Sequence, residues 1–261
     1  MTSSVPLLRL ADITRNFGAI EALRGISFDI ARGEVVALLG DNGAGKSTLV
    51  KIISGGLKAN SGQMFLEGAE RSFATPAEAK AAGIETVYQD LSLCTNVDVV
   101  ANFFMGRELV KRRFGIPVLD ERAMEQATEA ALATAGTKIP SLRTKVEYLS
   151  GGQRQAIELN RFVHWGGRLV LLDEPFAALG VEQTRRGLAM IRNIAAQGIG
   201  VVVITHIMAQ AFQVADRIVV IRQGLVVGDV PCADTSPDQV VRMITGESMI
   251  RPEPVKPISL H

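Results

Sequence analysis

The sequence predicts an α/β fold with a mainly parallel sheet, an antiparallel β part at the N-terminus and an inserted helical subdomain. Three short apolar runs are typical of strands buried on both faces: Val35–Leu39, Leu169–Leu172 and Val201–Ile204. Segments of helical character separate these runs, as crossover helices do in a parallel sheet. The chain has 261 residues. We expect one domain from residue 7 to 245, followed by an extended tail, 246–261.

The N-terminal part is predicted to be β structure. Ile26, Phe28 and Ile30 alternate with Ser27 and Asp29, which is the period-two pattern of a half-buried strand. The buried run 35–39 then ends in a glycine-rich turn, and a helix is predicted over 46–54.

The segment from about 91 to 148 is predicted to be the helical subdomain, because it has no apolar run like the three above. Asp120 is a candidate helix N-cap. Met124, Ala127 and Ala131 follow at helical spacing, and Gly136 is a candidate residue just past the helix end.

The C-terminal part is predicted to contain a hairpin and a last helix. The strands would be 217–221 and 225–227, with Gln223 and Gly224 at the turn. Ser236 and Pro237 are an N-cap followed by proline at the first helical position, and the helix runs to about Thr245.

Composition limits the kinds of partner. Lysine and arginine number 28 against 27 acidic residues, a balance that argues against a nucleic-acid partner. Two separate cysteines, Cys94 and Cys232, favour a reducing cytoplasm. The N-terminus lacks the pattern of a signal peptide, and no apolar run reaches the ~18 residues of a membrane span. The 47% of hydrophobic residues therefore fill a core or form a surface that docks on another molecule.

A phosphate-binding loop is predicted after the first buried run. The pattern G-x-x-x-x-G-K-[ST], known as Walker A, lies between a strand and a helix, as this interpretation requires. Its glycines let backbone N–H groups turn inward toward phosphate oxygens, and the helix N-terminus adds partial positive charge. Lys46 is expected on the β- and γ-phosphates, Ser47 on Mg²⁺ and Thr48 near the α-phosphate. The candidate nucleotide-binding residues are Gly40, Asp41, Asn42, Gly43, Ala44, Gly45, Lys46, Ser47 and Thr48.

Two carboxylates follow the second buried run. Asp173 stands at the carboxyl end of the strand, where a Mg²⁺ ligand is needed beside such a loop. Glu174 is a candidate base for the attacking water. The alternative is that Asp173, Glu174 and Pro175 form only a turn.

A second glycine-rich helix start lies at Leu149–Gln153. Ser150 and Gln153 have capping-box spacing, and Gly151 and Gly152 leave N–H donors suited to an anion. The alternative is an ordinary capped helix whose glycines serve close packing.

The loop 40–48, the Leu-Ser-Gly-Gly-Gln segment 149–153 and the pair 173–174, in that order, resemble the ATP-binding-cassette (ABC) ATPases. The resemblance implies a P-loop ATPase fold, ATP and Mg²⁺ as ligands, and a homodimer. In such a dimer Ser150, Gly151, Gly152 and Gln153 of one copy act in trans on the nucleotide of the other.

Further residues match the family's pattern one by one. Phe17 stands where an aromatic stacks on adenine, and the alternative is a core residue at a strand end. Gln89 matches the glutamine that touches Mg²⁺ and links the helical lobe to the sheet. His206 matches the histidine that contacts the γ-phosphate, although a lone histidine is more often a surface or capping residue. Two positions depart from the pattern: Phe176 replaces a small hydroxyl residue, and Gly180 replaces an aspartate that connects the two sites.

The segments 75–93 and 101–108 resemble importers of monosaccharides such as ribose, xylose or fructose. This resemblance implies a peripheral subunit at the cytoplasmic face of the inner membrane, integral-membrane permease subunits as partners, and indirectly a periplasmic sugar-binding protein. The alternatives are a cassette for another cargo, such as an amino acid, and a soluble ABC ATPase without a transporter.

Overall fold

The computed structural model describes residues 5–87, 93–134, 139–176 and 180–249. Within this part the chain divides into two compact units. The first comprises the described residues of Met1–Thr86, Gly167–Pro175 and Ile191–His261, and the second comprises those of Val87–Gly166 and Phe176–Met190. Among the described helices, none is long and apolar enough to cross a bilayer.

The first unit contains two sheets. A four-stranded antiparallel sheet has the order β2-β1-β4-β5, and a six-stranded sheet has the order β12-β11-β3-β10-β9-β6. The strands are β1 (Leu8–Phe17), β2 (Ile20–Ile30), β3 (Val35–Leu39), β4 (Ser61–Leu66), β5 (Ala69–Arg71), β6 (Ile84–Val87), β9 (Leu169–Asp173), β10 (Gly200–Ile204), β11 (Arg217–Arg222) and β12 (Leu225–Pro231). The helices that lie entirely within this unit are α1 (Lys46–Ile53), α2 (Pro76–Ala81), α7 (Met208–Val214) and α8 (Pro237–Thr245).

The three apolar runs form the centre of the six-stranded sheet, as predicted. β3 pairs in parallel with β10 on one side and β11 on the other, and β10 pairs in parallel with β9. Every residue of β3 and β10 is buried. Because these strands run in the same direction, their carboxyl ends share one edge of the sheet.

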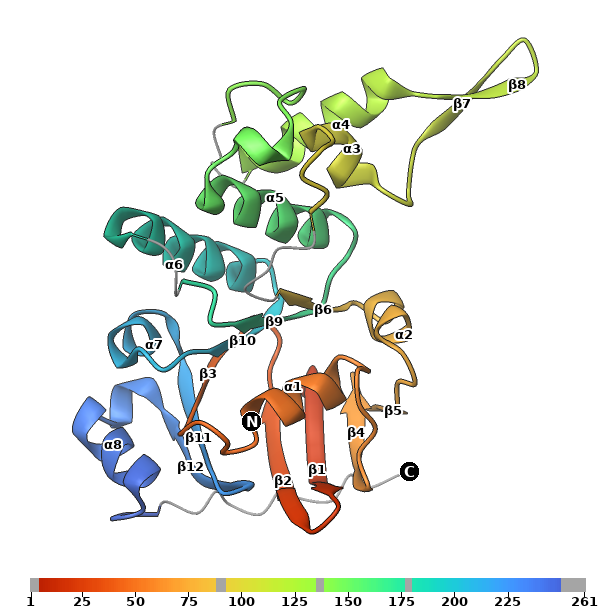
Figure 1. Cartoon of the computed structure of the whole chain (residues 1–261). Coiled ribbons are helices and arrows are strands. Elements are labelled where there is room, and N and C mark those ends of the chain that lie inside the picture. The colour runs from red at the N-terminus through yellow and green to blue at the C-terminus, as the bar shows by residue number, and fades with distance from the viewer. Residues whose placement is uncertain (1–4, 88–92, 135–138, 177–179, 250–261) are drawn as a thin grey trace. The chain divides into compact units, whose positions relative to one another are not determined.

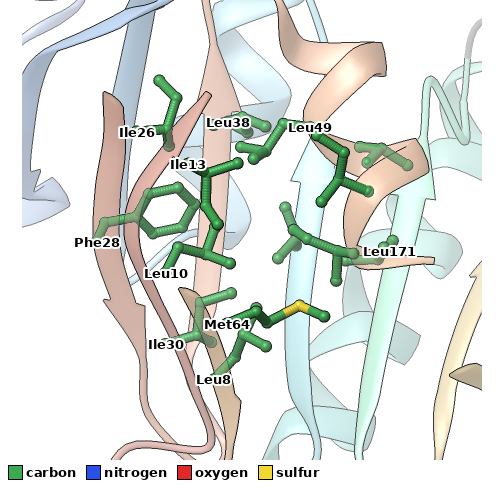
Figure 2. Close-up of a cluster of buried hydrophobic side chains, with 14 of the residues drawn as sticks. Leu8, Leu10, Ile13, Ile26, Phe28, Ile30, Leu38, Leu49, Met64 and Leu171 are labelled. Carbon is green, nitrogen blue, oxygen red and sulfur yellow. The ribbon is translucent and has the colours of Figure 1, made fainter. Parts of the chain in front are cut away.

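The core of the first unit lies between the two sheets and α1. Figure 2 shows inward-pointing side chains from β1 and β2 meeting Leu38, Leu49 and Leu171. A second cluster joins α7 and α8 to the other side of the central strands, with Val240 and Met243 fully buried. The phosphate loop therefore stands on a strand that is packed on both faces.

The predicted hairpin and last helix are confirmed. β11 and β12 pair antiparallel around Gln223 and Gly224. Ser236 caps α8 with Pro237 next to it, and Gly246 ends the helix with φ 87°. The part of the predicted tail beyond residue 249 lies outside the described residues.

The second unit is built mainly from helices. It contains α3 (Val99–Phe104), α4 (Glu121–Thr134), α5 (Gly151–His164) and the first part of α6 (Val181–Ala196), which continues into the first unit. Phe103 and Phe104 are buried among residues of α4 and α5, and Trp165 packs edge-on against Phe104 with 5.4 Å between ring centroids. Asp120 caps α4 as predicted, since its carboxylate accepts the N–H of Ala123 at 3.3 Å. Gly136 lies outside the described residues.

One feature of this unit is absent from the sequence prediction. Residues 91–148 were expected to be helical without strands, yet β7 (Val110–Arg113) and β8 (Ile116–Leu119) form an antiparallel hairpin. Its two-residue turn is Phe114 and Gly115, with φ of 53° and 80°. Positive φ at both turn residues matches the right-handed twist of the strands, which explains the hairpin. The sequence of β7, Val-Lys-Arg-Arg, does not alternate between apolar and polar residues, so a strand was not predicted here.

Candidate nucleotide site

The phosphate loop joins the carboxyl end of β3 to the N-terminus of α1. Asp173 ends β9, and Thr205 and His206 follow β10, so all of them lie along the same edge of the sheet. Parallel strands bring these segments together although they are far apart in the sequence. The structure thus places the loop, the carboxylate pair and the histidine in one site of the first unit.

Glycine is required in the loop for two reasons. Gly40, Gly43 and Gly45 have φ of 148°, 80° and 111°, which side chains rarely allow. In addition, a Cβ on Gly45 would lie 2.6 Å from the Ala22 oxygen and 2.7 Å from a Leu23 methyl. The loop therefore keeps its conformation and its close approach to β2 only with these residue types.

The turn of the β11–β12 hairpin supports the loop from the side. Gly224 donates its N–H to the Ala44 oxygen at 2.9 Å, and Arg24 donates its N–H to the Gly224 oxygen at 2.8 Å. A Cβ on Gly40 would collide with the Ile221 oxygen of the same hairpin. Sequence analysis predicted this hairpin but missed its contact with the loop, because only the sheet order makes the two segments neighbours.

Lys46 folds over its own loop. Its ammonium donates to the Gly40 oxygen at 2.6 Å and to the Asp41 oxygen at 2.8 Å. Burial lowers the pKa of Lys46, while the charges of Glu174, Asp41 and Asp173 oppose that effect. The ammonium thus lies within the site, bonded to the loop and close to the charges of these carboxylates.

Asp173 is half-buried at the end of β9. Burial raises the pKa of its carboxyl group, with a further contribution from Glu174, whereas Lys46 and Lys51 lower it. Leaving a charged carboxylate without a partner in a partly buried site costs free energy, and a bound cation would remove that cost. Ser47 is an exposed residue of the loop, and a carboxylate and a hydroxyl are oxygen ligands that suit Mg²⁺.

Glu174 is held in a rare conformation. Its φ is 49°, and its N–H donates to the Ile204 oxygen at 2.9 Å. Its Oε1 accepts the backbone N–H of His206 at 3.1 Å and lies 2.8 Å from Nδ1 of the same residue. The contacts to β10 and to His206 fix the direction of this carboxylate, and such strained backbone is concentrated at functional sites.

His206 is exposed at the end of β10, whereas its neighbour is not. The His206 side chain is 70% exposed. Thr205 is 1% exposed, and its hydroxyl accepts the N–H of Ile207 at 3.1 Å. This bond shapes the turn that presents His206 to Glu174. Sequence analysis did not single out Thr205; a hydroxyl residue directly before the histidine was the available signal.

Phe17 lies at the end of β1 and is 47% exposed, so it is not a core residue. The guanidinium of Arg15 lies over its ring, 5.0 Å from the centroid. Arg15 was missed by sequence analysis, although its spacing of two residues along a strand was a signal. The pair presents an aromatic face and a cation beside each other.

Ser150 to Gln153 begin α5 in the second unit. Gln153 donates its N–H to the Ser150 hydroxyl at 3.3 Å, and its side-chain oxygen accepts the Ser150 N–H at 3.0 Å. This is the predicted capping box. The capping box is therefore confirmed, whereas a Cβ on Gly152 would lie no closer than 3.9 Å to another residue, so this glycine is not required for close packing within the described residues. Ser150 is exposed, as binding to an anion requires.

The two departures from the family pattern have structural consequences. Phe176 is buried, and a Cβ on Gly187 would collide with its ring, so the two residues fit each other. Gly180 is exposed directly before α6 and accepts the N–H of Thr184 at 2.9 Å. Gln89, like residues 177–179 between these two positions, lies outside the described residues.

Comparisons with known proteins identify the family of this chain. Residues 23–177 match the family model described as "ABC transporter". The chain is 42% identical over 239 residues to the xylose/arabinose import ATP-binding protein XylG of Sulfolobus acidocaldarius, covering 92% of this chain and 94% of the relative. It is 40% identical over 247 residues to the fructose import ATP-binding protein FrcA of Rhizobium meliloti, with the same two coverages. A ribose import ATP-binding protein of Burkholderia cenocepacia is also 40% identical, and the match spans 49% of its length.

Solved structures show the same fold. The crystal structure of the ADP conformation of MJ1267, an ATP-binding cassette of an ABC transporter, superposes with a TM-score of 0.78 at 24% identity. The match covers 92% of this chain and 99% of that structure.

The fold and the loop–carboxylate site define a nucleotide-binding P-loop ATPase. The chain belongs to the ABC transporter ATP-binding family. Members that serve as import subunits hydrolyse ATP to drive transport.

Proposed function

We propose that this chain is the ATP-hydrolysing subunit that energises import of a monosaccharide such as xylose, fructose or ribose. The observation that carries the proposal is the site at the edge of the six-stranded sheet, where Lys46 bonds to the loop and lies within electrostatic range of the carboxylates of Asp173 and Glu174. Sequence similarity over almost the full length of two sugar import subunits supports the cargo class.

Residues of the loop would hold the nucleotide. Lys46 leaves the carbonyls of Gly40 and Asp41 for the β- and γ-phosphates, to which the loop also presents its N–H groups. Ser47, Asp173 and Gln89 would hold Mg²⁺, which supplies positive charge to the phosphate oxygens. Phe17 would stack on adenine, with Arg15 adding a cation beside it.

Glu174 would accept the proton of the attacking water. Because Oε1 is engaged by His206, we assign the proton to Oε2. His206 would both orient Glu174 and contact the γ-phosphate. Ser150, Gly151, Gly152 and Gln153 of a second copy would complete the site, so the active form is a homodimer.

The partners follow from the proposed transport role. The homodimer would lie at the cytoplasmic face of the membrane, bound to permease subunits that receive sugar from a binding protein outside. Differential contacts in the nucleotide-bound and nucleotide-free states would transmit closure to the permease.

Sugar uptake in the source organism tests this proposal. Deleting the gene should abolish uptake of xylose, fructose or ribose, and the wild-type gene should restore it. A Glu174→Gln gene should not restore it, because the variant binds ATP without splitting it. Intact uptake of all three sugars together with loss of uptake of an amino acid would assign another cargo, and no transport defect at all would favour a soluble ATPase.

A further inference from the structure

The β7–β8 hairpin of the second unit projects away from α3 and α4 (Figure 1). All four residues of β7 are exposed, as are three of the four residues of β8. Since the side chains of a strand alternate between two faces, this exposure means that neither face of the hairpin is covered within its unit. An isolated two-stranded hairpin is marginally stable in water. Its exposure therefore points to a partner.

The exposed hairpin side chains are unusually apolar. Phe114 at the tip is 93% exposed, Val110 is 65% and Ile116 is 64%. Leu119, at the other end of β8, is 51% exposed. Several exposed apolar side chains on one hairpin indicate an interaction site, whereas isolated exposed apolar residues are common on protein surfaces and would not.

The same hairpin carries three consecutive basic residues, Lys111, Arg112 and Arg113. Lys111 pairs with Asp120 at 3.0 Å. Within the described ranges, Arg112 and Arg113 have no carboxylate at ion-pair distance, and Arg113 instead lies 5.8 Å from the centroid of the Phe114 ring. The tip thus combines an apolar wedge with unneutralised positive charge.

An anionic lipid surface fits this combination better than a protein does. Basic side chains bind phosphate headgroups while an aromatic residue enters the boundary with the acyl chains. The cytoplasmic loops of membrane proteins carry an excess of lysine and arginine, which would repel this hairpin. Pro117 in β8 lacks an N–H donor, which disfavours addition of a partner strand.

We propose that the β7–β8 hairpin binds the anionic headgroups of the membrane, with Phe114 inserted at the headgroup boundary. The inference rests on the proposed function, because a transport subunit works next to a bilayer. It assigns to the hairpin a lipid contact made by residues that belong to neither the candidate nucleotide site nor a proposed permease contact.

Vesicle flotation of the full chain tests the proposal. Vesicles of phosphatidylcholine alone are compared with vesicles of equal parts phosphatidylcholine and phosphatidylglycerol. The wild type should bind the mixed vesicles more tightly, and added salt should weaken binding. The double variant Arg112→Gln, Arg113→Gln should bind about 25-fold more weakly, at about fivefold per basic residue. Phe114→Ser should lose roughly tenfold.

The matched control is Arg71→Gln with Arg242→Gln, which removes the same charge from two exposed residues of the first unit. It should bind mixed vesicles like the wild type. ATP hydrolysis without lipid, measured on the same samples, should be equal in all variants; its absence in the wild type would count against the proposed function and not against the hairpin. Equal lipid binding by the wild type and the hairpin variant overturns the inference. So does binding that appears only with permease in the vesicles, which would assign the hairpin to a protein partner.

Discussion

At the scale of single residues, the phosphate loop depends on one cation and on positions without side chains. Lys46 bonds to two carbonyls of its own loop, which holds the loop shape and keeps the ammonium inside the site. Its pKa is lowered by burial, yet three nearby carboxylates favour the charged form. A charged donor at this position can bond to the loop carbonyls before ATP binds and to phosphate oxygens afterwards.

Replacing Lys46 by alanine should weaken ATP binding by at least ~100-fold. Hydrogen bonds to charged groups contribute about 1.5–3 kcal/mol each, and two such bonds to phosphate oxygens give this factor. Titration calorimetry with ATP measures the loss. Lys80→Ala, which removes a lysine of α2 that pairs with Glu85, should leave ATP affinity unchanged. Equal affinity of the Lys46 variant and the wild type would show that the phosphates bind elsewhere.

Gly45→Ala should destabilise the protein more than Gly198→Ala does. Both positions have positive φ, so each change strains the backbone by roughly 1–2 kcal/mol. Only the Gly45 Cβ would also collide with Ala22 and Leu23, whereas the space around Gly198 is open. Urea denaturation of the two variants compares them, and identical midpoints would mean that β2 moves freely away from the loop.

At the scale of elements, two helices carry the same capping box in different places. In α5, Ser150 and Gln153 exchange bonds of 3.0 and 3.3 Å, and in α8 Ser236 and Gln239 do so at the same distances. Their capping energies should therefore be similar, about 1 kcal/mol each. The two helices differ in proposed function, because only the start of α5 is assigned to the nucleotide of a second copy.

Ser150→Ala and Ser236→Ala separate capping from catalysis. Both should lower the free energy of unfolding by about 1 kcal/mol. Only Ser150→Ala should reduce the rate of ATP hydrolysis, because we assign its hydroxyl to the nucleotide of a second copy. Thermal denaturation and a phosphate-release assay measure the two effects. Equal hydrolysis rates in both variants would reduce Ser150 to a capping residue.

Elements with strong local signals could be predicted from the sequence. The run 35–39 is apolar throughout, and proline after serine marks the start of α8. The β7–β8 hairpin could not be predicted, because Lys111 to Arg113 and Pro117 hide any alternation and Phe114 adopts a positive φ without being glycine.

The candidate site likewise contains residues that could be predicted from the sequence and contacts that could not. Motif spacing was enough to predict the loop residues and Asp173 as candidates, because backbone geometry at a strand end limits which residue types fit. The support of the loop by Gly224, and the ring contact between Arg15 and Phe17, depend on which strands become neighbours. Such contacts are set by tertiary packing, so a single sequence gives only weak signals for them.

At the scale of the whole molecule, the proposed chemistry is divided between two units. Lys46, Asp173, Glu174 and His206 belong to the first unit, and the Ser150 helix start belongs to the second. If the second unit completes the site of another copy, ATP should link two chains when it is bound and release them when it is split. Blocking hydrolysis should then trap the dimer.

Glu174→Gln should accordingly be a dimer in ATP and Mg²⁺ and a monomer without nucleotide, as measured by sedimentation velocity. The amide still accepts a hydrogen bond from the His206 N–H but cannot take the proton of a water, so ATP persists. Adding Ser150→Arg should return the variant to a monomer, because a bulky side chain would stand where the γ-phosphate of the partner site is expected. Adding Ser236→Arg, which also disturbs a capping box, should leave the dimer intact. If the Ser150→Arg combination still dimerises with ATP, the start of α5 does not cover the nucleotide and the two units serve separate tasks.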